Sequence, residues 1–535
     1  MFLQVPVAPA LTTDCARYSP GQVVHFKLSA PSVSLVRLFH LGKEIGSIRP
    51  TGASFDWTPP TADGRGYLAV AGGASCGVDV SSKWTLYPRY GYLAHFGSEI
   101  AAKAPAWIAK LNEFHLDGLQ FYDWQWRHHQ PLSPFESWVD IANRPTSASS
   151  IRALITEAHK RNIACMAYNL GYGGVDGSDE DGVSRSWGMF DDAEAKKQYS
   201  FAMPDGWATK HLDFYDPGNP GWQSYLFPRE KAAIEAFGFD GWHMDQVGNP
   251  GPKFTSTGQA MLLKDRLTNF LDAAKQQVPG TLIFNNVGGY GLGESLKSKT
   301  DAMYAEMWEW EGQKTYSDLQ AIIDRSRATG KSSLITAYMD YDKAKKYEGK
   351  PPGDFNPSGV LLTDASILAS GGSHLELGDG DSMLDHEYFP NHNLKPGADL
   401  LTRLKSYYDF QVAYEELLAS PSVHPSSLAL RGDGLSGTSE PGKIWSFARS
   451  DGSHTVFHLI NLVSAQDVLW RDRDGLRNPA KVLLNVKVRL PDGVKGRVWM
   501  ASPDDGIGAP HPLAVKDGWV VVPRLEYWTM LVVEQ

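Results

Sequence analysis

Two carboxylates in strand-like stretches of the sequence have the types and spacing needed to act together on one substrate. Asp245 closes the run "FDGWHMD" at 239–245, and Glu306 lies within "AMYAEMW" at 302–308. Cleavage of a glycosidic bond uses such a pair, one carboxylate as the nucleophile and the other as the acid and base. The short, ionised Asp245 suits the nucleophile. Glu306 has apolar and aromatic neighbours, so burial should raise its pKa and keep it protonated as the acid.

Two further acidic residues in the same stretches are alternatives to this pair. Asp240 opens the run that Asp245 closes, which favours a structural turn residue. Glu309 lies three residues after Glu306, past the expected end of the strand, and is the alternative acid. A single strand-end carboxylate more often accepts structural hydrogen bonds than it catalyses, so the hypothesis depends on the pair.

The segments that would position these residues alternate between strand-like and helix-like patterns. The strand-like runs lie at 118–124, 163–170, 211–217, 239–245, 281–287, 302–308, 333–339 and 372–377. Eight such units over about 330 residues predict a (β/α)8 TIM barrel with loop insertions. A doubly wound sheet is the alternative, but no phosphate-binding glycine loop follows any of the runs.

Catalytic residues of such barrels lie at the carboxyl ends of the strands, so the strand ends predict the site. Alternate strands can bring Asp245 and Glu306 about 5–6 Å apart, the separation of a retaining mechanism. The side chains predicted to bind substrate there are Asp123, Trp124, Trp126, Asn169, Asp216, Trp242, Asn286, Trp308 and Asp340. Carboxylates, amides and flat aromatic rings suit sugar hydroxyls and sugar faces better than phosphate groups.

Short β-like runs separated by turns flank the barrel on both sides. We expect a multidomain chain with an N-terminal immunoglobulin-like β-sandwich at 1–85 and a catalytic (β/α)8 barrel at 86–420. A C-terminal antiparallel β-sandwich of Greek-key type should follow at 421–535. Within it, "KIWSFARS" and "HTVFHLINLV" predict a hairpin around a Ser-Asp-Gly turn.

The composition excludes several classes of protein. The 535 residues carry a formal net charge of −10, which argues against a phosphate-tracking nucleic-acid protein. No run reaches 18 apolar residues, so no membrane span is expected. Cys15, Cys76 and Cys165 fit no zinc pattern, and buried free thiols are favoured over a pairing of Cys15 with Cys76. The adjacent His128 and His129 lack a third ligand nearby, so no metal site is expected.

The start of the chain leaves its location open. The segment "MFLQVPVAPA" lacks the basic region and the full apolar region of a secretory signal. A cytoplasmic location and an extracellular or periplasmic location after removal of a signal are both compatible with it.

Five segments of the chain are long enough to compare with known families. They are "YPRYGYLAHF" at 87–96, "LDGLQFYDWQWRHHQPL" at 116–132, "DFYDPGNPGWQSYL" at 213–226, "GFDGWHMDQVG" at 238–248 and "YAEMWE" at 304–309. In this order they resemble glycoside hydrolase family 66, which contains dextranases and cycloisomaltooligosaccharide glucanotransferases. The resemblance covers nearly the whole chain and implies a retaining enzyme acting on α-1,6-glucan. It assigns the nucleophile to Asp245 and the acid/base to Glu306.

The resemblance also bears on the reaction. The glucanotransferases of that family carry a large carbohydrate-binding insertion in the barrel region, and no β-rich block of that size fits here. This implies an endo-dextranase that releases isomaltooligosaccharides from dextran by double displacement, with cyclisation by intramolecular transglycosylation as the alternative. A non-catalytic glycan-binding barrel and an α-galactosidase-like barrel are further rivals. We expect a monomer without cofactor, and a loop at 171–210 that either walls the cleft or is a solvated surface loop.

Overall fold

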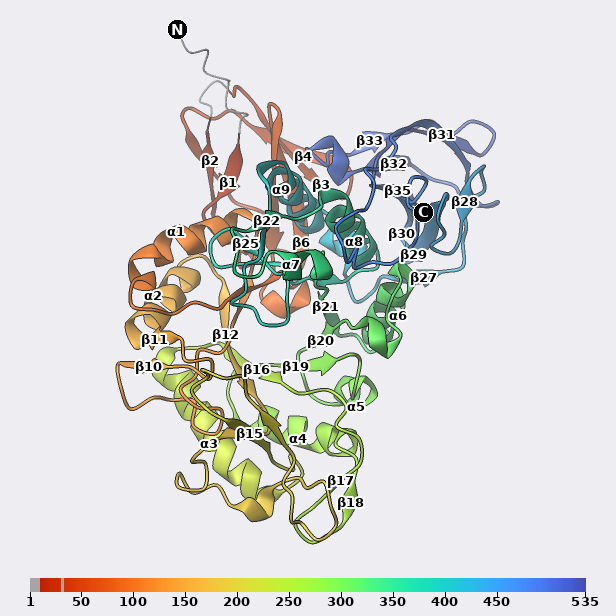
Figure 1. Cartoon of the computed structure of the whole chain (residues 1–535). Coiled ribbons are helices and arrows are strands. Elements are labelled where there is room, and N and C mark those ends of the chain that lie inside the picture. Colours follow the sequence, from red (N-terminus) through yellow and green to blue (C-terminus); the bar gives the residue numbers. More distant parts are fainter. Residues whose placement is uncertain (1–9, 30–32) are drawn as a thin grey trace.

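The computed structural model describes residues 10–29 and 33–535 and is built around a curled, mainly parallel sheet that forms a barrel-like core (Figure 1). The barrel strands are β8 (Tyr90–Leu93), β9 (Gly118–Phe121), β12 (Ala164–Leu170), β16 (Gly241–Asp245), β19 (Thr281–Val287), β20 (Ala302–Glu306), β21 (Ser332–Thr336), β23 (Ser373–His374) and β24 (Leu377–Gly378). Parallel pairing follows chain order from β8 to β23, and β24 pairs back with β8. β23 and β24 act as two halves of the eighth strand, and β25 (Ser382–Met383) adds an antiparallel hairpin. The predicted barrel-like core is confirmed.

One predicted barrel strand is wrong, and one barrel strand was not predicted. The run at 211–217 forms β15 (His211–Phe214), which pairs with β13 (Gly173–Val175) and β14 (Ser200–Ala202) in a small antiparallel sheet outside the barrel. The side chains of β15 alternate in exposure, whereas all of β8 is buried, as expected for a strand covered on both faces. Because the unpredicted β8 comes first, Asp245 and Glu306 keep their places on the fourth and sixth strands.

Helices cover the outside of the barrel. They are α1 (Ile100–Glu113), α2 (Ala148–His159), α3 (Pro220–Phe237), α4 (Lys264–Gln277), α5 (Leu292–Lys297), α6 (Tyr316–Arg327), α7 (Tyr341–Lys346), α8 (Pro357–Ala369), α9 (Ala398–Ala413) and α10 (Glu415–Leu418). Asn219 caps α3 by accepting a hydrogen bond from the N–H of Gly221 (2.8 Å), and Gly238 ends it with a φ of 80°. α8 is buried along nearly its whole length because it packs against α6, α9 and a strand of the C-terminal region.

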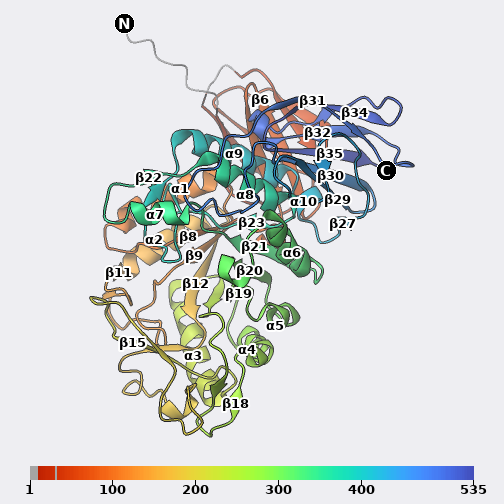
Figure 2. The ribbon, with the colours of Figure 1, turned by 45° about the vertical axis from the view of Figure 1, so that its right-hand side comes forward.

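Short elements extend the loops between these units. They are the strand pairs β10 (Ser137–Val139) with β11 (Pro145–Ser147), β17 (Lys253–Phe254) with β18 (Ala260–Met261) and β22 (Gly353–Asp354) with β26 (Leu394–Lys395), and the 3-10 turns η1 (Trp84–Leu86), η2 (Arg185–Trp187), η3 (Glu309–Glu311) and η4 (Pro503–Asp505). In Figures 1 and 2, β15 and β18 lie at the end of the molecule that carries α3 and α4, far from the two terminal β regions.

The N-terminal region consists of two sheets that share one core. One sheet contains β1 (Leu11–Thr13), β2 (Val24–Leu28) and β5 (Ser54–Trp57), and the other contains β4 (Lys43–Ile48), β3 (Val36–His40), β6 (Arg65–Ala71) and β7 (Ala74–Val80). Phe26 from the first sheet and Leu38 and Val78 from the second belong to the same buried cluster. The immunoglobulin-like assignment and the boundary at residue 85 stay predictions.

The C-terminal region is antiparallel in most of its pairings. Its larger sheet contains β27 (His424–Ser426), β28 (Leu435–Ser436), β29 (Ile444–Ser450), β30 (His454–Asn461), β35 (Trp528–Glu534), β32 (Val498–Ala501) and β33 (His511–Pro512), and β31 (Leu483–Arg489) pairs with β34 (Trp519–Leu525). The predicted hairpin is confirmed, since β29 and β30 pair from Ile444 with Asn461 to Ser450 with Thr455. The Greek-key assignment and the boundary at residue 420 stay predictions.

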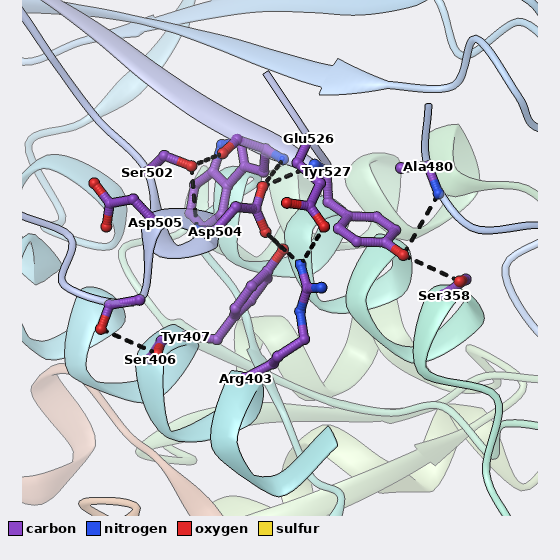
Figure 3. A network of polar contacts seen from close by, with 12 residues as sticks. Ser358, Arg403, Ser406, Tyr407, Ala480, Ser502, Asp504, Asp505, Glu526 and Tyr527 are labelled. Carbon is purple, nitrogen blue, oxygen red and sulfur yellow. Dashed lines mark hydrogen bonds and ion pairs between the residues drawn. The ribbon is translucent and has the colours of Figure 1, made fainter. Parts of the chain in front are cut away.

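Polar contacts fix the C-terminal region to the barrel helices (Figure 3). Arg403 and Tyr407 on α9 reach Glu526 and Asp504: the guanidinium of Arg403 lies 2.8 Å from Glu526 Oε1, and the O–H of Tyr407 donates to Asp504 Oδ1 at 2.9 Å. Burial raises the pKa of Asp504 to about 6, while donors including Tyr407 oppose the shift. The network therefore holds the C-terminal region against α9, the helix that follows the last barrel strand.

A buried arginine joins the N-terminal sheet to the barrel. Arg89 is fully buried and forms ion pairs with Asp79 of β7 (2.6 Å), Asp117 before β9 (3.1 Å) and Glu415 of α10 (3.3 Å). Removing one partner from such a cluster leaves an uncompensated buried charge, which strongly destabilises a fold.

The last two features of the fold are the state of the cysteines and the character of the helices. All three cysteines are buried and free, in agreement with the favoured prediction. Within residues 10–29 and 33–535, no helix has both the length and the apolar character needed to cross a membrane.

Candidate active site

Asp245 and Glu306 face each other at the carboxyl ends of β16 and β20. The amide of Asn285, on β19 between them, donates a hydrogen bond to each: Nδ2 lies 2.8 Å from Asp245 Oδ1 and 2.9 Å from Glu306 Oε2. These two carboxylate oxygens are therefore no more than about 5.7 Å apart, which is compatible with the close spacing of a retaining glycosidase.

Strand alternation explains why these side chains point into the barrel. Side chains two residues apart lie on the same face of a strand. Ile283 and Tyr304 belong to the cluster that fills the barrel interior. Asn285 and Glu306, two residues later on the same strands, therefore point inward as well, and Asp245 meets them there.

Hydrogen-bond donors around Asp245 favour its ionised form. The O–H of Tyr168 donates to Asp245 Oδ2 at 2.6 Å, in addition to the bond from Asn285. Burial raises the pKa of Asp245, and the donors Tyr168, Asn285 and the N–H of Gln246 oppose this shift because they favour the charged carboxylate. The ionised carboxylate is the form that a nucleophile needs.

Glu306 is buried, and Oε1, the oxygen that does not contact Asn285, accepts two hydrogen bonds. The indole N–H of Trp308 and the O–H of Tyr338 both donate to Oε1 at 2.9 Å. Burial raises the pKa of Glu306 to about 7, and the nearby charge of Asp245 adds to the shift. Because two donors occupy Oε1, the better-placed oxygen for a proton is Oε2, which shares the Asn285 amide with Asp245.

The two carboxyls line a pocket of about 470 Å³, and half of its lining residues are aromatic. The aromatic lining residues are Tyr122, Tyr168, Phe201, Tyr304, Trp308, Trp310, Tyr338 and Phe389. Trp310 is 67% exposed and stacks on Trp308 with a centroid distance of 3.9 Å and an interplanar angle of 26°. An apolar cleft with a few convergent polar groups is typical of a small-molecule or oligosaccharide site. The loop at 171–210 contributes one wall residue, Phe201.

Of the nine residues predicted to bind substrate, Trp308 lines the pocket and three others point to the outside of the barrel. Asn169 donates to the carboxylate of Glu230 on α3. Trp242 is fully buried and donates to the carbonyl of Asn169 at 3.3 Å. Asn286 donates to the carbonyl of Tyr304 at 2.7 Å. Strand alternation turns all three away from the pocket, contrary to the prediction.

Two predicted residues after β9 are buried beside the pocket. The indole of Trp124 is fully buried, packs against Phe239 and donates to the carbonyl of Tyr168 at 3.0 Å, so it serves the core. Asp123 has a left-handed backbone with a φ of 51°, and burial raises the pKa of its carboxyl to about 7. Neither side chain lines the pocket.

The remaining three predicted residues also lie outside the pocket. Trp126 has the guanidinium of Arg127 over its ring at 4.3 Å. Asp216 accepts a hydrogen bond from the N–H of Gly218 at 2.8 Å, just before α3. Asp340 is buried and accepts from the N–H of Asn356 at 2.7 Å. Both carboxylates therefore fix loop conformations.

The alternative acidic residues and the paired histidines have other partners. Glu309 forms an ion pair with Arg473 of the C-terminal region at 2.6 Å and does not line the pocket. Asp240 accepts from the N–H of Cys165 at 2.7 Å at the opposite end of β16, which fits a structural role. His129 contacts Asp181 at 2.8 Å.

Several pocket residues were not among the nine predicted to bind substrate. Asn285, Tyr168 and Tyr338 could have been found by applying the two-residue period from the expected strand ends. Glu387 could not, because it lies on the irregular loop between β25 and β26, where no period applies. Its carboxylate accepts from the O–H of Tyr341, at 2.9 Å on Oε1 and 2.8 Å on Oε2, and enters the pocket as a third acidic group.

Comparison with known proteins gives matches along the chain. The model of the family described as glycosyl hydrolase family 66 matches residues 13–532. The chain is 26% identical to a cycloisomaltooligosaccharide glucanotransferase from Niallia circulans, covering 97% of this chain and 71% of that protein. It is 25% identical to a dextranase from Streptococcus salivarius, covering 86% of this chain and 65% of that protein.

A solved structure shares the fold. The cycloisomaltooligosaccharide glucanotransferase of Paenibacillus sp., complexed with cycloisomaltoheptaose, aligns with a TM-score of 0.89 and 24% identity. The alignment covers 98% of this chain and 100% of that chain. The arrangement of terminal β regions around a central barrel is therefore common to both.

Proposed function

The chain belongs to glycosyl hydrolase family 66, and we propose on this premise that it cleaves the α-1,6-glucosidic bonds of dextran with retention, as an endo-dextranase. One observation carries the proposal: the Asn285 amide bridges Asp245 and Glu306 at 2.8 and 2.9 Å. That bridge sets two carboxyls close enough to act on one anomeric carbon.

The reaction proceeds in two steps. Asp245 attacks the anomeric carbon and forms a glucosyl ester, while the bond to O6 of the departing glucan breaks and O6 takes the proton from Glu306. Glu306, now ionised, then removes a proton from water. The water oxygen attacks the anomeric carbon, and the ester bond to Asp245 breaks. Two inversions give net retention, and Glu306 ends the cycle protonated.

Neighbouring groups favour each step. The donors Tyr168 and Asn285 favour the ionised form of Asp245 before the attack. Trp308 and Tyr338, which donate to Glu306 Oε1, stabilise the carboxylate that forms once the proton has left. The exposed ring of Trp310 offers a flat surface for a glucose unit beyond the cleavage point. No cofactor is required by this chemistry.

The proposal is tested by substitution of each carboxyl. Purified Asp245→Asn should release new reducing ends from dextran at least on the order of 10³-fold more slowly than the wild type, since the nucleophile is lost. Asp240→Asn is the matched control, because it changes an aspartate at the other end of the same strand. Near wild-type activity in Asp245→Asn would disprove the assignment. Binding of dextran without new reducing ends in the wild type would indicate a non-catalytic barrel.

Intramolecular transglycosylation is the second candidate function. The similarity to glucanotransferases favours this reaction. The alignment with the solved structure of one of them covers 100% of that chain. In that reaction a glucose hydroxyl of the bound chain replaces water in the second step. Mass spectrometry of the products separates the two, because a cyclic oligomer lacks the mass of one water.

A further inference from the structure

Two histidines and an aspartate meet where the first and last barrel strands join. His95 follows β8, Asp379 follows β24, and His392 lies on the loop between β25 and β26. One ligand atom from each lies within 4.8 Å of the others. His95 Nδ1 is 2.9 Å and His392 Nε2 is 3.5 Å from Asp379 Oδ2. We propose that these three side chains bind a divalent metal ion, and Zn²⁺ is the ion that we expect.

The donor set and its spacing suit zinc. Two imidazoles and one carboxylate are ligands that Zn²⁺ commonly takes, and neighbouring ligand atoms of one tetrahedral ion with bonds of about 2.0–2.1 Å lie roughly 3.3 Å apart. The separations of 2.9 and 3.5 Å from Asp379 Oδ2 fall on either side of this value. The side chain of His95 is 41% exposed, so water can complete the coordination.

The outer contacts orient all three ligands. Asp379 Oδ1 accepts a hydrogen bond from the N–H of Ala94 at 3.0 Å, which leaves Oδ2 for the ion. Ser382 Oγ lies 3.4 Å from His392 Nδ1, on the ring nitrogen away from Asp379. His392 Nε2 is buried and has no hydrogen-bond partner among the described residues. A metal-binding histidine typically has such a partner on its second nitrogen while the first faces the ion.

The position of the group gives the ion a structural role. Among the described residues, the register of β24 on β8 comprises the single pair Gly378 and Tyr92. An ion held by His95 and Asp379 would join these two strand ends just beyond that pair. Through His392 it would also hold the loop that carries Phe389, which stacks on Tyr122 in the pocket at 4.4 Å. The consequence for substrate binding rests on the proposed function, but the metal site does not.

Two other groups of potential ligands are less suitable. In the group around Asp409, the amine of Lys405 already lies 2.5 Å from the carboxylate and supplies its positive charge. In the group around His374, both ring nitrogens are engaged, one with Asp364 and the other with the carbonyl of Ala337. Neither arrangement leaves an accessible, unengaged imidazole.

Metal content is the direct test. The full chain is loaded with ZnCl₂, dialysed and analysed by elemental mass spectrometry, and calorimetry gives the dissociation constant. We expect about one zinc per chain, and binding at least about 10-fold weaker in His95→Gln and His392→Gln. His159→Gln is the matched control, since it alters a histidine beside Asp240 and Cys165 in a further possible ligand group. Equal zinc binding in all three variants, or none in the wild type, would overturn the proposal.

Two measurements do not depend on the folding of the variants. Zinc should raise the thermal midpoint of the wild type, because an ion that binds only the folded chain stabilises it. Electron paramagnetic resonance of Cu²⁺ bound to the wild type should show two nitrogen ligands, and a spectrum without nitrogen coupling would contradict the assignment. Neither measurement uses dextran, so a failure of the proposed function leaves this test intact.

Discussion

Replacing Tyr338 with phenylalanine should move the alkaline limb of the pH profile of kcat/KM to higher pH by about one unit. This limb reports the acid of the free enzyme, which must be protonated to act. In the wild type it should fall near pH 7, because burial raises the pKa of Glu306 to about that value. Activity is therefore lost as the pH rises through about 7.

The size of the shift follows from the contact that is removed. The O–H of Tyr338 donates to Glu306 Oε1 at 2.9 Å and favours the ionised carboxylate, so its loss raises the pKa of Glu306. A hydrogen bond to a charged group contributes about 1.5–3 kcal/mol, and one pKa unit corresponds to about 1.4 kcal/mol. Part of the bond persists when the carboxyl is neutral, which leaves a shift of about one unit.

The assay is the initial rate of reducing-end release from dextran at low substrate concentration across pH 4–9. Tyr341→Phe is the matched control, because its hydroxyl donates to Glu387 instead of Glu306. Tyr168→Phe provides the complementary case: it removes a donor to Asp245 and should move the acid limb to higher pH. An unchanged alkaline limb in Tyr338→Phe, or an equal shift in Tyr341→Phe, would refute the assignment of Glu306 as the acid.

Three further substitutions separate the pocket from its surroundings. Trp310→Ala should raise KM for dextran about 2- to 12-fold with little change in kcat, since an exposed stacking ring contributes roughly 0.5–1.5 kcal/mol; saturation kinetics measure both. Trp124→Ala should lower the free energy of unfolding by about 3–5 kcal/mol in denaturant titrations and leave KM unchanged, and a raised KM at full stability would instead support its predicted contact with substrate. Glu309→Gln should keep most activity on dextran while Glu306→Gln loses about 10²–10⁴-fold, and equal losses would reassign the acid.

The carboxylate pair could be predicted because each member lies at the end of a strand-like run. Asp245 and Glu306 needed only the identity of their strands, and the rule that barrels place function at the carboxyl ends. Asp245 and Glu306 keep their strand numbers because the structure adds one strand before them, β8, and places one predicted strand, β15, outside the barrel. β8 has four residues with no alternation to mark it, while β15 carries a β pattern that antiparallel pairing in a loop also produces.

The direction of each side chain was the weaker part of the prediction. Trp242 lies three residues before Asp245, so the two cannot share a face of one strand. The same period selects Asn285 over its neighbour Asn286 once Glu306 is known to point inward. Strand periodicity cannot predict Glu387, because its place in the pocket depends on how a long loop folds back over the barrel.

Asn285 links the two carboxyls through one amide. Its amide donates one hydrogen bond to Asp245 and one to Glu306, and each bond favours the ionised form of its acceptor. Loss of this amide should therefore raise both pKa values, so that the two limbs of the pH profile move together. Tyr168 and Tyr338 each contact one carboxyl only, so the structure tunes nucleophile and acid separately through its tyrosines and jointly through its asparagine.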